Sequence, residues 1–161
     1  MNIFEFAREN ERAAEKAYLE MAENAGSKGL KTIFTMLAAM EKKHFEILVN
    51  MEKSQNIKNV EFHPLKTAKD QFIKMQTSRE KFKASASQTE LYRKAQQTEK
   101  EAEEFYREKA KEAQDEGQKK VFIQIAEEEK KHFIVLDNII DFVTGPSAYL
   151  ENAEFNQIGS D

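Results

Sequence analysis

The segment Glu-Lys-Lys-His occurs twice in this chain, at residues 41–44 and 129–132, an offset of 88 residues. Two of the three histidines in the sequence lie in these two segments. The same offset relates many other identical residues: Glu11 and Glu99, Tyr18 and Tyr106, Ala14 and Ala102, Phe34 and Phe122, Phe45 and Phe133, and Leu48 and Leu136. A repeat at one fixed offset predicts two copies of a single structural unit.

Each copy has the pattern of a helical hairpin. Apolar and small residues recur every three to four positions on both sides of a short break, which is the spacing of helices with one buried face. The breaks are the glycine-containing stretches 26–29 and 115–117. We therefore expect antiparallel hairpins over residues 3–53 and 88–143. Together they predict an all-α fold, a four-helix bundle made of two duplicated hairpins.

The segment between the hairpins, residues 54–87, is predicted to be a long and partly helical crossover. Pro64 is suited to the first position of a helix within it. Ser87 followed by Glu90 has the form of a capping box and is expected to begin the third bundle helix. The pair Gly145-Pro146 should end the fourth helix. The predicted bundle domain is therefore residues 1–146, and the tail 147–161 is expected to dock on the bundle or on a partner.

Composition excludes several classes of protein. The chain has two prolines and five glycines, which favours helix, and a net charge of −4, which argues against nucleic-acid binding. It has no cysteine, which excludes disulfides and thiolate-bound metals in this chain. No signal peptide and no apolar run of membrane length is present in the sequence. We expect a cytoplasmic protein without a membrane partner.

The duplicated acidic residues and histidines are predicted to meet in one layer. Residues equally far from the turn of an antiparallel hairpin lie at the same height. The midpoint of Glu11 and Glu41 is the turn residue Gly26, so the two carboxylates lie level, about 22 Å from the turn at ~1.5 Å per residue. The second copy has the same relation, and Glu and His three positions apart share one helix face. The predicted metal ligands are Glu11, Glu41, His44, Glu99, Glu129 and His132.

Carboxylates on these faces require compensating charge. The neighbouring residues of each stripe are Phe, Leu, Ile, Ala and Tyr. Burying an unpaired carboxylate costs several kcal/mol. Two divalent cations balance four carboxylates, and oxygen ligands with imidazole suit iron or manganese. The sequence therefore predicts a two-metal centre. The alternative is a duplicated bundle whose buried acids and histidines only pair with one another.

Other polar residues near the layer have weaker patterns. Tyr18 and Tyr106 are interpreted as buried aromatics whose hydroxyls donate to the ligand carboxylates. Arg8 lies one turn from Glu11 and is a candidate partner for a carboxylate. A solvated or pore-lining position, and not metal ligation, is expected for Glu15 and Glu103. His63 and the lysine pairs inside the two repeated segments are expected to face water.

The doubled pattern of Glu-x6-Tyr and Glu-x2-His resembles the rubrerythrin branch of the ferritin-like superfamily over about residues 3–143. The resemblance implies a ferritin-like bundle with a non-haem di-iron centre. Glu41 and Glu129 would be bridging carboxylates, Glu11 and Glu99 outer ligands, and the two histidines end ligands. It also implies reduction of hydrogen peroxide or oxygen by the diferrous protein.

Two departures from the family pattern bear on function. Without cysteine this chain has no rubredoxin-type iron, so an external electron donor such as rubredoxin is expected. Rubrerythrins tend to add a glutamate three residues after the third-helix ligand, where this chain has Ala102, matched by Ala14. This more symmetric pattern resembles ferroxidase centres, so an iron-binding ferroxidase is the alternative function. A homodimer is expected, in which the two chains either keep or exchange their second hairpins.

Overall fold

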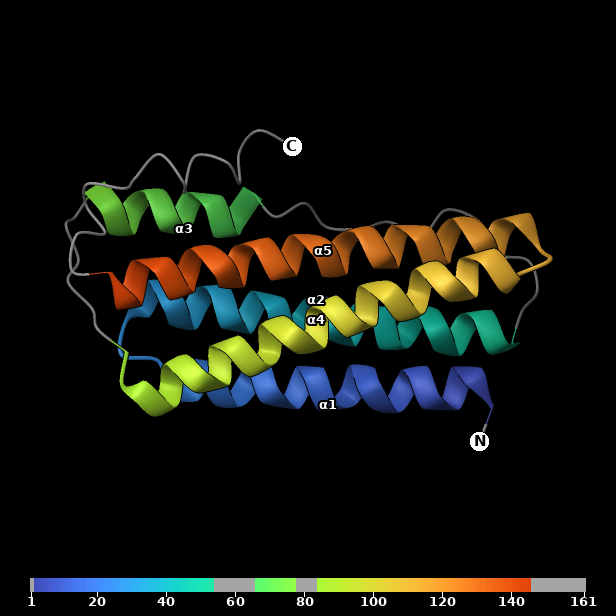
Figure 1. Cartoon of the computed structure of the whole chain (residues 1–161), viewed down its shortest axis with the longest axis horizontal. Coiled ribbons are helices and arrows are strands. Elements are labelled where there is room, and N and C mark those ends of the chain that lie inside the picture. The colour runs from blue at the N-terminus through green and yellow to red at the C-terminus, as the bar shows by residue number, and fades with distance from the viewer. Residues whose placement is uncertain (1, 54–65, 78–83, 146–161) are drawn as a thin grey trace.

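The computed structural model describes residues 2–53, 66–77 and 84–145 and contains five helices in those ranges (Figure 1). They are α1 (Ile3–Glu23), α2 (Lys28–Lys53), α3 (Lys66–Thr77), α4 (Ala86–Glu112) and α5 (Glu116–Thr144). Helices α1 and α2 pack along each other as one hairpin, and α4 and α5 as the other. The predicted all-α bundle of two hairpins is thus confirmed. His63, Pro64 and the tail 147–161 lie outside the described residues.

Helix ends follow local capping chemistry. Asn2 accepts a hydrogen bond from the backbone of Glu5 at the start of α1, and Asp115 accepts one from Gln118 at the start of α5. The capping box of α4 is Ser85 with Gln88, so our prediction of Ser87 with Glu90 was wrong by two residues. Glutamine and glutamate serve equally at this position, and the earlier of two overlapping matches begins the helix.

Helix α3, from the crossover, packs against α2. Gly29, near the start of α2, lets the two helices approach closely. A Cβ at this position would lie 2.6 Å from the sulfur of Met75, so the Met75 side chain would have to move. Ala68 and Met75 of α3 are buried. The crossover therefore adds apolar cover to one end of the bundle.

The apolar core has two parts. One cluster, including Leu30, Phe34 and Leu136, lies toward the turn of the first hairpin. The other, including Ile47, Phe122 and Ile125, lies toward the turn of the second. On every bundle helix, the duplicated acidic and histidine residues fall between the two clusters. A buried polar layer thus divides the core, and the apolar packing on either side fixes its position.

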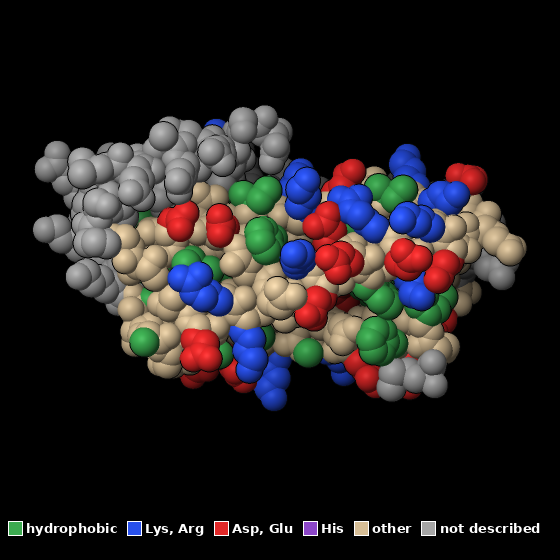
Figure 2. All heavy atoms as spheres, in the orientation of Figure 1, with side chains coloured by type: hydrophobic (Ala, Val, Ile, Leu, Met, Phe, Trp, Pro, Cys, Tyr) green, Lys and Arg blue, Asp and Glu red, His purple; other side chains and the backbone are tan. Residues whose placement is uncertain are grey.

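The outer surface is charged with both signs. Lysine and arginine side chains alternate with acidic ones over the face seen in Figure 2. This mixture agrees with the absence of a basic excess in the sequence. Among the helices in the described ranges, none combines the length and the apolar character that a membrane span needs.

Candidate metal centre

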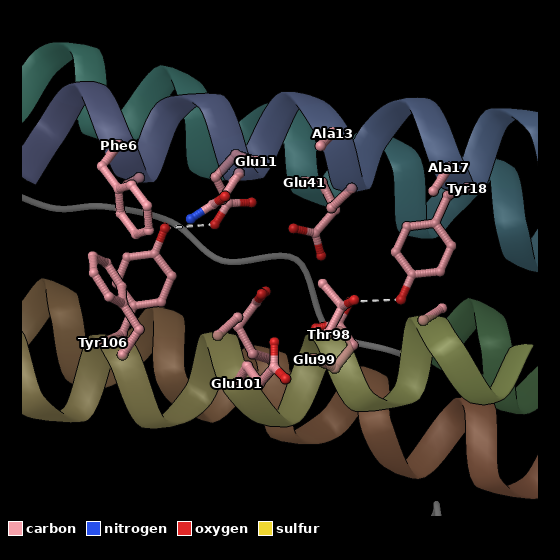
Figure 3. A pocket seen from close by; sticks show the side chains of 17 residues that line it. Phe6, Glu11, Ala13, Ala17, Tyr18, Glu41, Thr98, Glu99, Glu101 and Tyr106 are labelled. Atoms are coloured by element: carbon pink, nitrogen blue, oxygen red, sulfur yellow. Dashed lines mark hydrogen bonds between the residues drawn. The ribbon is translucent and has the colours of Figure 1, made fainter. Parts of the chain in front are cut away.

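The six predicted ligand residues come together in the buried layer. Helix α1 contributes Glu11, α2 contributes Glu41 and His44, α4 contributes Glu99, and α5 contributes Glu129 and His132. None of the six is more than 3% exposed. Figure 3 shows Glu11 and Glu41 facing Glu99 across the space between the hairpins. Packing of the two apolar clusters, together with the equal heights of the repeats, brings these side chains together.

The layer divides into two overlapping groups of four residues. One group is Glu11, Glu41, His44 and Glu129, and the other is Glu41, Glu99, Glu129 and His132. In each group one nitrogen or oxygen atom per residue lies within 4.8 Å of all the others, so each group could hold a metal ion. Glu41 and Glu129 belong to both groups, which is the position of a carboxylate shared by two metals.

Both histidines present Nδ1 to the carboxylates. His44 Nδ1 lies 3.1 Å from Glu129 and 3.5 Å from Glu11. His132 Nδ1 lies 2.8 Å from Glu41 and 3.5 Å from Glu99. Each imidazole therefore points the same ring nitrogen at the centre of its own group of four.

Protonation balances the charge of this metal-free layer. Burial, with the charge of Glu41, raises the pKa of Glu11 to about 8. Burial and neighbouring carboxylates also raise the pKa of Glu129 well above its usual range. Burial opposes the charged form of each histidine, but the adjacent carboxylates outweigh it and raise the pKa of both His44 and His132. The protonated forms of these groups are therefore favoured at the positions where cations would bind.

The pKa of Glu41 is shifted in the opposite direction. Burial and the charge of Glu99 act to raise its pKa, but hydrogen bonds with Glu11, His132 and His44 outweigh them and lower it. One of the two carboxylate oxygens in each of Glu11, Glu41, Glu99 and Glu129 is nonetheless buried without a hydrogen-bond partner. Buried polar atoms without partners are rare in proteins and indicate a missing ligand. Four carboxylates and two imidazoles fit two divalent cations in charge and in donor type.

Two tyrosines connect the layer to the opposite hairpin. Tyr18 Oη, from α1, donates to Glu99 Oε1 on α4 at 2.5 Å. Tyr106 Oη, from α4, donates to Glu11 Oε1 on α1 at 2.6 Å (Figure 3). Burial, followed by the adjacent carboxylates, raises the pKa of both phenols. Each hydroxyl therefore stays protonated and holds one carboxylate in place.

Comparison with known families identifies the chain. The family model described as Rubrerythrin matches residues 2–140. This protein belongs to the rubrerythrin family. The resemblance expected from the doubled motif is thus confirmed, and with it the ferritin-like bundle. The family implies a di-iron type of site. The chain matches no curated protein and no solved structure in the other two comparisons.

Some polar residues outside the layer have other partners or another exposure than the sequence-based interpretation gave them. Arg8 does not pair with Glu11, because it lies near the surface and pairs with Glu52 at 2.8 Å. The half-buried Glu103 pairs with Arg107 at 2.8 Å, and Glu15 is half-buried. Neither Glu15 nor Glu103 belongs to a group that could hold a metal ion.

Sequence reasoning missed one residue at this rubrerythrin-family site. Glu128, next to Glu129 on α5, is 8% exposed and its Oε1 lies 2.7 Å from His44 Nε2. The acidic run 127–129 offered a signal. The repeat gave no reason to select it, since the corresponding residue of the first copy is Met40.

A part-open cavity of about 430 Å³ lies between α1 and α4 and reaches the layer. Its floor includes Glu11, Glu41, Glu99 and Glu129, and its walls include Phe6, Phe105 and six alanines. Ala14 and Ala102 line it where the family pattern tends to have a further glutamate in the second copy. The small side chains leave the layer accessible to small molecules from this side.

Proposed function

We propose that this protein is a di-iron peroxide reductase of the rubrerythrin type. Glu41 and Glu129 would bridge two iron ions, Glu11 and Glu99 would each bind one, and His44 and His132 would complete the two ligand sets. The observation that carries the proposal is the pair of overlapping four-residue groups, each buried and each with unpartnered carboxylate oxygens.

Two ferrous ions, when bound, supply the two electrons that reduce hydrogen peroxide. With two protons, the O–O bond breaks and two waters form. The residues of the chain bind the metals, hold the carboxylates and control access. Tyr18 and Tyr106 fix Glu99 and Glu11 by their hydrogen bonds. The alanine-lined cavity admits a small oxidant to the layer while excluding larger reductants.

Electrons must reach the centre from outside this chain. The sequence has no cysteine and therefore no thiolate-bound iron of its own. A separate one-electron carrier such as rubredoxin would return the two iron ions to the ferrous state after each turnover. The protein is further proposed to act as a homodimer and to contribute to protection from oxidative stress.

A ferroxidase is the second candidate, and one observation favours it. Ala14 and Ala102 line the cavity, so neither half of the layer has an additional glutamate at these positions to respond to a change in iron charge. A ferroxidase would oxidise ferrous iron with oxygen and pass it on. Its reaction with oxygen would then be at least as fast as its reaction with peroxide.

The test is rapid mixing of the anaerobic, ferrous-loaded protein with stoichiometric hydrogen peroxide or with oxygen. A peroxide reductase oxidises much faster with peroxide. Equal or reversed rates would support the ferroxidase. The variant E103Q is a matched control, because Glu103 is half-buried on α4 but pairs with Arg107 outside the layer. Size-exclusion chromatography tests the homodimer and separates it from a large iron-storing shell.

A further inference from the structure

The 88-residue repeat is broken beside the metal layer. Each of the six proposed ligands and both tyrosines has an identical counterpart in the other hairpin. Glu128, however, corresponds to Met40. Both residues are buried, with 8% and 4% of their surface exposed. The buried carboxylate beside His44 thus has a buried thioether as its counterpart in the other copy of the repeat.

This difference changes how the two imidazoles are held. His44 Nε2 lies 2.7 Å from Glu128 Oε1, across the interface between α2 and α5. A contact of this length between an imidazole nitrogen and a carboxylate oxygen suits an Nε2–H group that donates to Glu128. With Nε2 held by Glu128, the Nδ1 atom of His44 is directed at Glu129 and Glu11, the side on which a metal would bind.

His132 has no equivalent support. Its Nε2 is buried and has no hydrogen-bond partner among the described residues. Its Nδ1 lies 2.8 Å from Glu41 Oε1. No acceptor at Nε2 among the described residues holds this ring in the orientation and tautomer that would present Nδ1 to a metal.

We infer that Glu128 is a positioning residue that makes the two metal positions unequal. The position formed by Glu11, Glu41, His44 and Glu129 binds a divalent cation more tightly and fills first. The position that contains His132 fills second. A carboxylate behind a ligating histidine typically changes metal affinity by about tenfold to hundredfold, so the two affinities should differ by that factor. The inference rests on the proposed ligand set, but not on the reaction that the centre performs.

Calorimetric and optical titration of the full-length, metal-free protein with cobalt(II) tests this inference without turnover. The wild-type protein should show two binding events separated about tenfold to hundredfold in affinity. E128M, which copies the first hairpin, should weaken the tight event until the two merge. M40E, which copies the second, should instead tighten the weak event. Because E128M and M40E should change different binding events, they show which event belongs to the position with His44 and which to the position with His132.

E128Q distinguishes positioning from a general effect of charge. Its amide oxygen still accepts a hydrogen bond from Nε2, so E128Q should keep most of the separation that E128M loses. Circular dichroism and melting of the metal-free variants establish that each is folded. If E128M does not fold, M40E and E128Q carry the test.

Three results would overturn the inference: two equal events in the wild-type protein, an unchanged tight event in E128M, or equal losses in E128Q and E128M. A wild-type protein that binds no cobalt at all would overturn the proposed metal layer itself.

Discussion

Loading the metal-free protein with two divalent cations should release about four protons at pH 7. The raised pKa of Glu11, about 8, keeps its carboxyl protonated at this pH. The pKa values of Glu129, His44 and His132 are likewise raised, which favours the protonated form of each. Metal ligands must be deprotonated to bind. Two cations of charge +2 would thus replace four protons, and the net charge of the buried layer would not change.

Proton release is measured by titrating cobalt(II) into the protein in buffers of different ionisation enthalpy. The dependence of the observed heat on that enthalpy gives the number of protons released. The apparent affinity should also rise steeply from pH 6 to pH 8, because the protons compete with the metal. E11Q removes one titrating group and should lower the proton count by about one, whereas E103Q should leave it unchanged. A proton count near zero, or an affinity that is the same at pH 6 and pH 8, would refute the proposal that protons occupy the cation sites.

Three further predictions concern the same layer. The free energy of unfolding of the metal-free protein should fall as pH rises from about 4.5 to 8, because Glu11 binds its proton more tightly in the folded state. The loss between pH 5 and pH 8 should be about 4 kcal/mol, at ~1.4 kcal/mol per pH unit, and urea unfolding at these two pH values measures it. A fall of the same size in the metal-loaded protein would contradict this origin. Y18F and Y106F each leave a buried carboxylate oxygen without its donor and should lower the free energy of unfolding by about 1–3 kcal/mol. Y92F changes a buried tyrosine outside the layer and should leave the metal affinity unchanged. The double variant E41Q/E129Q should lose most of its bound iron in elemental analysis and be more stable without metal than the wild-type protein; unchanged iron content would exclude both residues as bridging ligands.

The sequence was sufficient for the fold because the repeat carried the information. One hairpin defines the heights of its own residues, and the second copy repeats them. Glu11 and Glu41 could therefore be placed level from their distances to the turn, and so could Glu99 and Glu129. The apolar stripes predicted which faces are buried. Heights and faces together were enough to predict the six-residue layer.

Contacts between the hairpins could not be derived in this way. The repeat gives no register for α2 against α5, and the contact of His44 with Glu128 depends on that register. Arg8 had a nearby acid in sequence, but its position near the surface favours Glu52, where neither charge must leave water completely. The capping box of α4 was ambiguous for a different reason, since Ser85 with Gln88 and Ser87 with Glu90 both fit the pattern.

Each group of four draws three side chains from one hairpin and one from the other. A hairpin by itself could not close either group. A shorter ancestor encoding only one copy could therefore have completed the layer only as a pair of identical chains, related by a true twofold axis. In such a pair, one substitution in the gene appears in both chains and therefore at both metal positions. A carboxylate behind one histidine and a thioether behind the other became available only after the two copies were joined in a single gene and could mutate independently.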